Sequence, residues 1–201
     1  MMSDANCRPV ASCDAIDRPI AVHPRHPRER SRQARTAEAE AEYRAALRLD
    51  ASFAAAAINL SDLYRQFGRD GDGEQSLREA LSASAENASL HQALGLTLVR
   101  LKRNDAALDE LRQAASLDPG QARYAYVYAV ALHSSGRRDD ALAVLRNGLQ
   151  LHPNNREMLS AALALSREKG DSVSALEYAE RLSRLMPGNR EIEALIQQIK
   201  R

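Results

Sequence analysis

Residues 88–121 read ASLHQALGLTLVRLKRNDAALDELRQAASLDPGQ, and this stretch decides the fold. Its apolar residues recur at spacings of three, four and seven in two successive segments, which is the period of one face of an α-helix. Asn104 stands before the second segment as a good helix N-cap, and Pro119 prevents that helix from continuing. The stretch therefore predicts two helices joined by a short turn.

The same pattern recurs with a period of 34 residues. Pro119, Pro153 and Pro187 are each 34 residues apart. A fixed period of this length is typical of proteins built from repeated supersecondary units. Dividing the chain on it gives a half repeat, four full repeats and a final helix, at 37–53, 54–87, 88–121, 122–155, 156–189 and 190–201.

Small residues occupy two matching positions of the aligned repeats. The eighth position holds Ser61, Gly95 and Ala129 in the first three repeats. The twentieth position is small in all four repeats, as Gly73, Ala107, Ala141 and Ala175. Because small side chains let two helix backbones approach closely, each repeat is predicted to be a helical hairpin.

Turn and capping residues fit the same division. Glycine stands three times in the fifteenth position, where a left-handed residue ends a helix, as Gly68, Gly136 and Gly170. Two residues further on, the expected N-caps of the second helices are Asp70, Asn104 and Ser172. The expected N-caps of the first helices are Asn87, Asn155 and Asn189. These signals predict helices at 37–49, 54–67, 72–83, 88–101, 104–117, 122–135, 138–151, 156–169, 172–185 and 190–200.

With these positions in place, the chain resembles the tetratricopeptide repeat (TPR) family. Repeat 88–121 is most similar to the family motif, through Leu94-Gly95, Leu98, Ala107, Leu111, Ala114 and Pro119. The resemblance implies an all-α fold, a right-handed superhelical α-solenoid whose concave face is lined by first helices. A capping helix is predicted at the C-terminal end, over 190–201, with Ile192, Leu195, Ile196 and Ile199 facing inward.

A narrower resemblance covers about residues 37–201. The segments NLSDLYRQFGRDGDGEQSLREAL, HQALGLTLVRLKRNDAALDEL and ARYAYVYAVALHSSGRRDDALAVL are similar to the repeat tail of some bacterial multihaem cytochromes c. Those proteins attach haem through Cys-x-x-Cys-His, which does not occur in this sequence. The resemblance implies a separate bacterial repeat module and carries over no electron-transfer activity.

Residues 1–36 form a separate compositional block. They hold four of the seven prolines, Pro9, Pro19, Pro24 and Pro27, and show no helical apolar period, so we predict a disordered Pro/Arg-rich arm. Cys7 and Cys13 match no zinc or redox spacing and are interpreted as inert thiols. Because the chain as written has no apolar signal-peptide region, we expect it in the cytoplasm, or in the periplasm if its start is truncated.

Composition and motifs argue against several classes of function. A formal net charge of +1 removes the electrostatic argument for nucleic acid as a general partner. No apolar run approaches the roughly 20 residues that span a bilayer. No nucleotide-binding, zinc-protease, thiol-redox or serine-hydrolase motif occurs, and His91, His133 and His152 lack metal-ligand spacing. We therefore expect no enzyme activity, no catalytic or metal-binding residue, and no cofactor.

The concave face is the candidate functional surface. In the TPR family, ligands lie against the second, fifth, ninth, twelfth and thirteenth residues of each repeat, which share one helix face. From these positions we select Arg65, Gln92, Arg100, Arg123, Tyr126, His133 and Arg167 as partner-binding residues. An aromatic ring beside guanidinium groups is a common anchor for a peptide. By register Tyr128 belongs to the core stripe and Tyr126 does not.

The functional hypothesis is a non-catalytic protein–protein interaction scaffold. Its concave TPR groove would bind a peptide or a partner protein. Two alternatives stay open at this point. One is a self-associating structural module, a homo-oligomer in which a terminal repeat docks on another copy. The other is an accessory subunit of a redox or envelope complex related to the multihaem cytochromes.

Overall fold

The computed structural model describes residues 27–200, with side chains from Arg35 onward. The chain divides into two units, Met1–Arg35 and Thr36–Arg201, and the side-chain contacts described below belong to the second. The disorder predicted for residues 1–26, and the interpretation of Cys7 and Cys13, lie outside the described residues.

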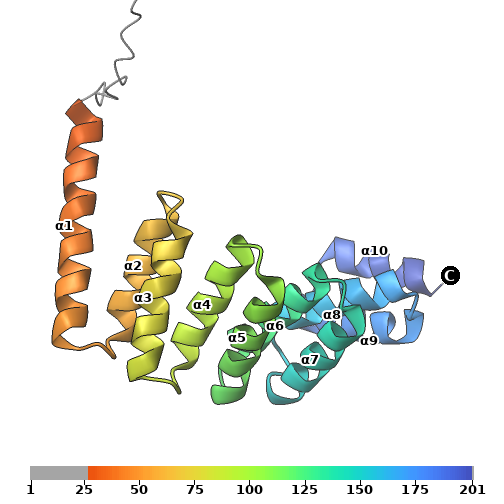
Figure 1. Cartoon of the computed structure of the whole chain (residues 1–201). Helices are drawn as coiled ribbons and strands as arrows, with labels where there is room; N and C mark the ends of the chain where they lie inside the picture. Colours follow the sequence, from red (N-terminus) through yellow and green to blue (C-terminus); the bar gives the residue numbers. More distant parts are fainter. Residues whose placement is uncertain (1–26, 201) are drawn as a thin grey trace, which may run out of the picture. The chain divides into compact units, whose positions relative to one another are not determined.

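Helices account for the regular structure of residues 27–200, and no strand occurs among them, which confirms the predicted all-α class. Within the second unit, consecutive helices from α2 onward pack as hairpins and stack in chain order (Figure 1). The helices are α1 (Pro27–Leu49), α2 (Ala54–Arg65), α3 (Asp70–Ala83), α4 (Ala88–Arg100), α5 (Asn104–Leu117), α6 (Ala122–Ser134), α7 (Arg138–Leu151), α8 (Arg156–Lys169), α9 (Ser172–Leu185) and α10 (Arg190–Ile199).

Helix α1 begins ten residues earlier than predicted. The sequence pattern placed its start at residue 37, whereas the helix begins at Pro27. Proline is well accepted at the first helical position, because the missing N–H has no partner there in any case. The nine residues that follow Pro27 are mostly Arg, Glu, Gln and Ala, which are good helix formers. The predicted arm is therefore wrong over residues 27–36.

The asparagine caps of the first helices are confirmed. The side chain of Asn87 accepts a hydrogen bond from the N–H of Leu90, and Asn155 accepts one from the N–H of Met158. Asn189 does the same for Glu191 and Ile192 at the start of α10. Each cap satisfies backbone donors that the first turn of a helix leaves free.

The predicted caps of the second helices are wrong by one position. Asp70, Asn104 and Ser172 are the first helical residues, and the N-caps are Arg69, Arg103 and Asp171. Of these three caps, only Asp171 uses its side chain, which accepts from the N–H of Ser174. In these turns a single residue, the N-cap, separates the left-handed residue from the start of the second helix. The second helix therefore begins at the residue that was predicted to be its N-cap. Asp70 still lies where the helix dipole favours a carboxylate.

The turns inside the repeats contain a left-handed residue, as predicted. Gly68, Gly136 and Gly170 have φ of 67°, 79° and 78°. In the second repeat Lys102 occupies the equivalent position with φ of 60°. A left-handed conformation is unfavourable for a residue with a Cβ, so this turn is the strained member of the set.

Close helix approach at the small residues is confirmed. A Cβ added to Gly95 would lie 2.7 Å from Cγ of Leu111 and 3.2 Å from the carbonyl oxygen of Ala107. A Cβ added to Gly73 would lie 2.8 Å from Oγ of Ser61. The first and second helices of these two hairpins therefore touch without room for another methyl group.

The buried apolar residues form two clusters that meet within α5. The first contains Ala57, Leu77, Ala80, Leu90, Leu94, Leu98 and Ala107. The second begins at Leu108 and runs through α6, α7, α8 and α9 to Leu182. Ile192, Leu195, Ile196 and Ile199 of α10 pack against it, as expected for the capping helix. The capping helix thus covers the end of the second cluster.

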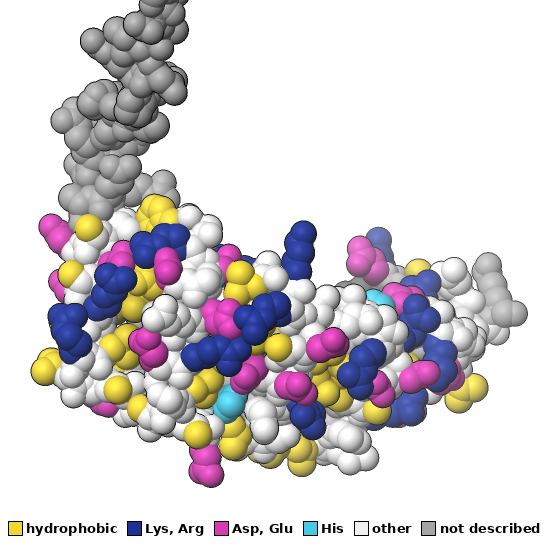
Figure 2. All heavy atoms as spheres, viewed as in Figure 1, with side chains coloured by type: hydrophobic (Ala, Val, Ile, Leu, Met, Phe, Trp, Pro, Cys, Tyr) yellow, Lys and Arg dark blue, Asp and Glu magenta, His cyan; other side chains and the backbone are white. Residues whose placement is uncertain are grey.

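Ion pairs connect neighbouring repeats at a regular offset of 29 or 30 residues. Where the carboxylate comes from the earlier repeat, the pairs are Glu40–Arg69 (3.4 Å), Asp70–Arg100 (2.6 Å), Glu74–Arg103 (2.7 Å) and Asp139–Lys169 (2.6 Å). Arg138–Glu168 (3.3 Å) has the reverse polarity. We call these five ion pairs the ion-pair ladder. Figure 2 shows basic and acidic side chains interspersed over the face in view.

Burial works to raise the pKa of the Glu74 carboxyl, but hydrogen bonds from Arg78 and Arg103 outweigh it and lower the pKa below the ordinary 4.5. Because the folded pKa lies below the unfolded one, this stabilisation is complete above the unfolded pKa. It is lost as the pH falls through the folded pKa. The ladder is thus weakened by acid.

We predict that Gly95→Ala destabilises the fold by about 1–3 kcal/mol, because the new methyl group meets Leu111 and the backbone of α5. The matched control is Gly71→Ala on α3, where a Cβ meets nothing within 4 Å. There the substitution should stabilise by up to about 1 kcal/mol. Urea unfolding measures both effects. Equal midpoints for the two variants would contradict the close helix approach.

We predict that Glu74→Gln lowers stability at pH 7 and reduces the loss of stability that the wild type shows between pH 5 and pH 3. Arg103→Met removes one of the two donors and should change both quantities in the same direction by a smaller amount. Urea unfolding followed by circular dichroism at several pH values gives the comparison. A Glu74→Gln variant with the pH dependence of the wild type would show that this carboxylate is not linked to folding.

Candidate functional site

Three adjoining hollows open along the first helices. The polar hollow, of about 480 Å³, is lined by Ile58, Ser61, Asp62, Arg65, Ser89, Gln92, Ala93, Leu96, Thr97, Arg100 and Arg123. The tyrosine hollow, of about 470 Å³, is lined by Gln121, Ala122, Arg123, Tyr126, Val127, Asn155 and Glu157. The apolar hollow, of about 150 Å³, is lined by Leu96, Val99, Asn104, Leu108, Leu111, Val127, Val130, Ala131, Ser134 and Ser135.

Each pair of hollows shares one residue. Leu96 lines both the polar and the apolar hollow, and Val127 lines both the apolar and the tyrosine hollow. Arg123 lines the polar and the tyrosine hollow. The three hollows therefore adjoin one another, and we call them together the groove; their lining residues come from α2, α4, α5, α6 and the start of α8.

Five of the seven predicted site residues lie in the groove. Arg65, Gln92 and Arg100 line the polar hollow, Tyr126 lines the tyrosine hollow, and Arg123 lines both. These side chains come from α2, α4 and α6, which are first helices of three successive repeats. The repeat positions therefore brought five of the seven residues together beside these hollows, and their role in binding a partner stays a prediction.

His133 and Arg167 are not part of the groove. Nε2 of His133 lies 3.9 Å from Oε2 of Glu168, so this side chain faces α8. Arg167 is exposed on α8 and lines none of the three hollows. Their positions in the repeat are those of the groove, but neither residue lines any of the three hollows.

The apolar hollow was not among the predicted site residues. Its signal is nevertheless present in the sequence, because Leu96, Val99 and Val130 occupy groove positions of the second and third repeats. Selecting only polar and aromatic side chains passed over them.

The arginines of the polar hollow differ in what holds them. Nε of Arg100 lies 2.6 Å from Oδ1 of Asp70, and its Nη2 donates to Oγ1 of Thr97 at 2.9 Å. Nε of Arg65 lies 3.2 Å from Oδ1 of Asp62. Arg123 has no ion-pair partner among the described residues and is exposed. Of these three arginines, Arg123 is the one whose guanidinium is free to bind an anion.

Gln92 offers a second unused donor. Its Nε2 is buried and has no hydrogen-bond partner among the described residues. A buried amide N–H without a partner is costly, since such groups are nearly always satisfied. Because this atom has almost no accessible surface, a carbonyl or carboxylate oxygen in the polar hollow would satisfy it only once the side chain turned toward the hollow.

Tyr126 combines a structural and a surface role. It is half-buried and packs against the second core cluster while lining the tyrosine hollow. Tyr128 is also half-buried against that cluster, so the prediction that only Tyr128 packs in the core is wrong. Tyr128 lines a different hollow, with Asp105 and Arg137. Alternate tyrosines on α6 thus reach opposite sides of the helix.

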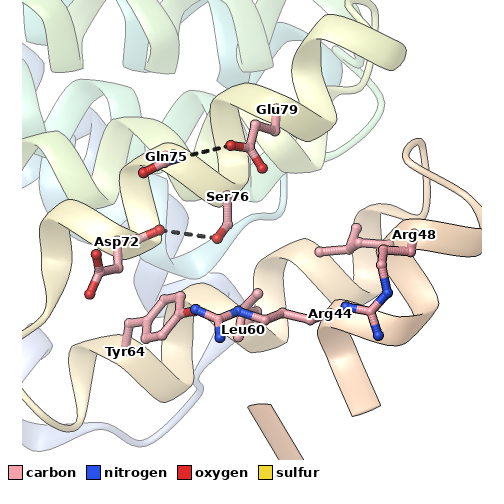
Figure 3. A pocket seen from close by; sticks show the side chains of 9 residues that line it. Arg44, Arg48, Leu60, Tyr64, Asp72, Gln75, Ser76 and Glu79 are labelled. Atoms are coloured by element: carbon pink, nitrogen blue, oxygen red, sulfur yellow. Dashed lines mark hydrogen bonds between the residues drawn. The ribbon is translucent and has the colours of Figure 1, made fainter. Parts of the chain in front are cut away.

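A fourth hollow, of about 310 Å³, lies between residues 44–48 of α1 and the first hairpin (Figure 3). Tyr64 lines this hollow and connects the first hairpin to α1. Its side chain is 2% exposed, and its hydroxyl donates a hydrogen bond to Oε1 of Glu40 at 3.2 Å. The guanidinium carbon of Arg69 lies 4.5 Å from the centroid of the Tyr64 ring. Burial and the Glu40 carboxylate raise the pKa of Tyr64. These contacts hold the end of α1 in place.

Two histidines have structural contacts. Nδ1 of His91 lies 2.6 Å from Oε2 of Glu110, and its Nε2 lies 2.9 Å from the carbonyl oxygen of Ala85. Nε2 of His152 lies 2.9 Å from the carbonyl oxygen of Pro119. Within residues 27–200, no cluster of three or more His, Cys, Asp or Glu side chains is placed to hold a metal ion. Over the same span, none of the helices combines the length and apolar character needed to cross a bilayer.

Comparison with known proteins identifies the repeats. The family model described as tetratricopeptide repeat matches residues 98–166. This part of the chain is similar to the tetratricopeptide repeat. No curated protein shows significant sequence similarity to it.

Solved TPR structures share the fold. MamA superposes with a TM-score of 0.64 at 19% identity, over 85% of this chain and 95% of that one. YrrB, described as a TPR protein with an unusual peptide-binding site, gives 0.62 at 23% identity, over 85% and 88%. PilF of Pseudomonas aeruginosa gives 0.65 at 20% identity, over 85% and 78%. At these identities the likeness concerns the TPR solenoid fold.

We predict that Arg100 and Arg123 differ in their contribution to stability. Arg100→Met breaks the contact with Asp70 between two repeats and should cost about 1 kcal/mol. Arg123→Met removes an unpaired side chain and should change stability by less than about 0.5 kcal/mol. Urea unfolding of both variants tests the difference. If Arg123→Met is as destabilising as Arg100→Met, the guanidinium of Arg123 is not free.

Proposed function

We propose that the protein is a non-catalytic interaction scaffold that binds a peptide segment of a partner protein in the groove. The observation that carries this proposal is the succession of three adjoining hollows across α2, α4 and α6. Adjoining hollows along successive repeats suit an extended chain better than a compact small molecule.

The unused donors of the groove favour a peptide. The guanidinium of Arg123 lacks an ion pair and the amide of Gln92 lacks an acceptor among the described residues. A peptide supplies carbonyl oxygens at every residue and carboxylates at acidic ones. Binding would therefore satisfy groups that the free protein leaves without partners. YrrB, which shares the fold, is itself described as binding a peptide.

The charge of the polar hollow favours an acidic segment over a basic one, while Glu157 adds a carboxylate to the tyrosine hollow. Arg65 and Arg100 already have carboxylate partners, so Arg123 supplies the net unpaired charge of the polar hollow. An exposed guanidinium adds attraction that salt screens, so affinity for an acidic peptide should fall as ionic strength rises.

A fluorescence-anisotropy screen of a peptide library tests the proposal. The probes are labelled nine-residue peptides of varied sequence, and the best binders are then measured by calorimetry. We predict that Arg123→Glu and Tyr126→Ala each weaken the best binders by about 10- to 100-fold, or about 1–3 kcal/mol. Because Tyr126 also packs against the core, thermal unfolding must show that each variant remains folded at the assay temperature.

The matched control is Arg184→Glu, which makes the same charge change at an exposed position of α9 outside the groove. It should leave peptide affinity within about twofold of the wild type. Binding that survives both groove substitutions, or that Arg184→Glu weakens equally, would place the partner elsewhere and contradict the proposal.

A further inference from the structure

We propose that the apolar hollow is a specificity pocket that takes one apolar side chain of a bound peptide, two or three residues from a carboxylate held by Arg123. This inference rests on the proposed function and names the class of peptide that the groove selects. It is carried by a break in the ion-pair ladder, by exposed apolar surface at that break, and by the neighbouring unpaired charge.

The ion-pair ladder is interrupted where the second and third repeats meet. The position of Asp70 is held one repeat later by Asn104, and the position of its partner Arg100 by Ser134. A further repeat along, Arg138 and Glu168 restore an ion pair at these positions. Asn104 and Ser134 both line the apolar hollow.

The second kind of ladder contact is lost at the same junction. Glu40 and Glu74 occupy the same position in successive repeats and pair with Arg69 and Arg103. One repeat later Leu108 replaces the glutamate and lines the apolar hollow. Arg137, which stands where a ladder partner would be, is the N-cap of α7 and pairs instead with Asp140 in the first turn of that helix. Between the second and third repeats, both kinds of ion pair are therefore absent, and the apolar hollow lies at this junction.

The walls of this opening leave apolar surface in water. Val99 and Val130 are 41% and 42% exposed, whereas Leu108 and Leu111 are buried. The two core clusters also divide here, between Ala107 and Leu108. Covering such surface releases water and favours an apolar occupant. The hollow has no carboxylate or guanidinium of its own, so a charged side chain would find no partner in it.

The size of the hollow limits the occupant to one side chain. Its volume is about 150 Å³. An apolar cavity of about that size binds one benzene molecule, so a leucine, methionine or phenylalanine side chain is of suitable bulk. Leu96 and Val127 line both this pocket and a neighbouring hollow, so the pocket adjoins the rest of the groove.

The spacing between charge and pocket follows from the geometry of α6. Val127 and Val130 lie four and seven residues after Arg123, which is about 6 Å and 10 Å along the helix axis. An extended peptide advances about 3.3 Å per residue, so a peptide that follows α6 between Arg123 and the apolar hollow spans this distance with two to three residues. The ligand class is thus an extended peptide with Asp or Glu and an apolar residue at that separation.

The test uses acetylated, amidated peptides of nine residues in a Gly/Ser background. Each carries one Asp and one Leu separated by one to five positions, and a companion set has Gly in place of Leu. Calorimetry on the full-length protein should show binding at least tenfold tighter with Leu than with Gly, with the maximum at a separation of two or three.

The variant that isolates the pocket is Val99→Thr/Val130→Thr, which keeps side-chain shape at two exposed helical positions while adding hydroxyl groups. It should reduce the Leu-to-Gly affinity ratio to about twofold and leave affinity for the Gly peptides unchanged. The matched control is Val173→Thr on α9, which is 83% exposed and outside the groove, and it should keep the wild-type ratio.

The outcomes separate this inference from the proposed function. Peptides that bind through Arg123 with equal affinity for Leu and Gly, or an unchanged ratio in the double variant, overturn the specificity pocket and leave the groove intact. Binding that Arg123→Glu and Tyr126→Ala do not weaken overturns both.

Discussion

Direct contact between the two helices of each repeat is the constraint on which the rest of the structure depends. Where Gly95 faces Leu111 there is no space for a methyl group, so the hairpin has one spacing and one register. Neighbouring hairpins then stack with a fixed offset, which sets the distance between residues of successive first helices. The groove is a consequence of that offset, because its hollows are bounded by side chains from α2, α4 and α6.

Contacts between repeats divide into a polar and an apolar kind. On either side of the central junction, ion pairs such as Glu74–Arg103 and Asp139–Lys169 bridge successive repeats. At the junction itself, Leu108 and its neighbours leave a pocket instead. Surface ion pairs contribute little energy but fix geometry through their short contacts. Their loss at one junction gives up little stability and leaves apolar surface of Val99 and Val130 exposed there.

Most of the fold could be predicted from the sequence because its signals are local and repeated. The prolines and asparagines of the 34-residue period gave the ends of α4 to α10 to within one residue. The start of α1 was missed because it lies before the period, where propensity and a favourable Pro27 act without an apolar pattern. The caps of the second helices were displaced by one residue because turn geometry, rather than side-chain preference, decides where those helices begin.

The sequence predicted several of the residues that line the candidate groove, but not which of their side chains form ion pairs. Helical register placed Arg100 and Arg123 on the same face, and both line the groove. That Arg100 is held by Asp70 while Arg123 is unpaired depends on contacts between residues 30 apart, which a single helix does not reveal. The apolar hollow was missed because only polar and aromatic side chains were selected at the groove positions, although Leu96, Val99 and Val130 occupy such positions.

The meeting of the two core clusters inside α5 has a consequence for cooperativity. Ala107 contributes to one cluster and the adjacent Leu108 to the other, so a single helix of 14 residues is shared by both halves of the solenoid. In a linear array of repeats, opening can begin at either end and stop at the weakest boundary. Either half can therefore unfold while α5 stays folded, because α5 still packs in the core cluster of the other half. Backbone amides of α5 should be the slowest to exchange with solvent, since their release requires both halves to open.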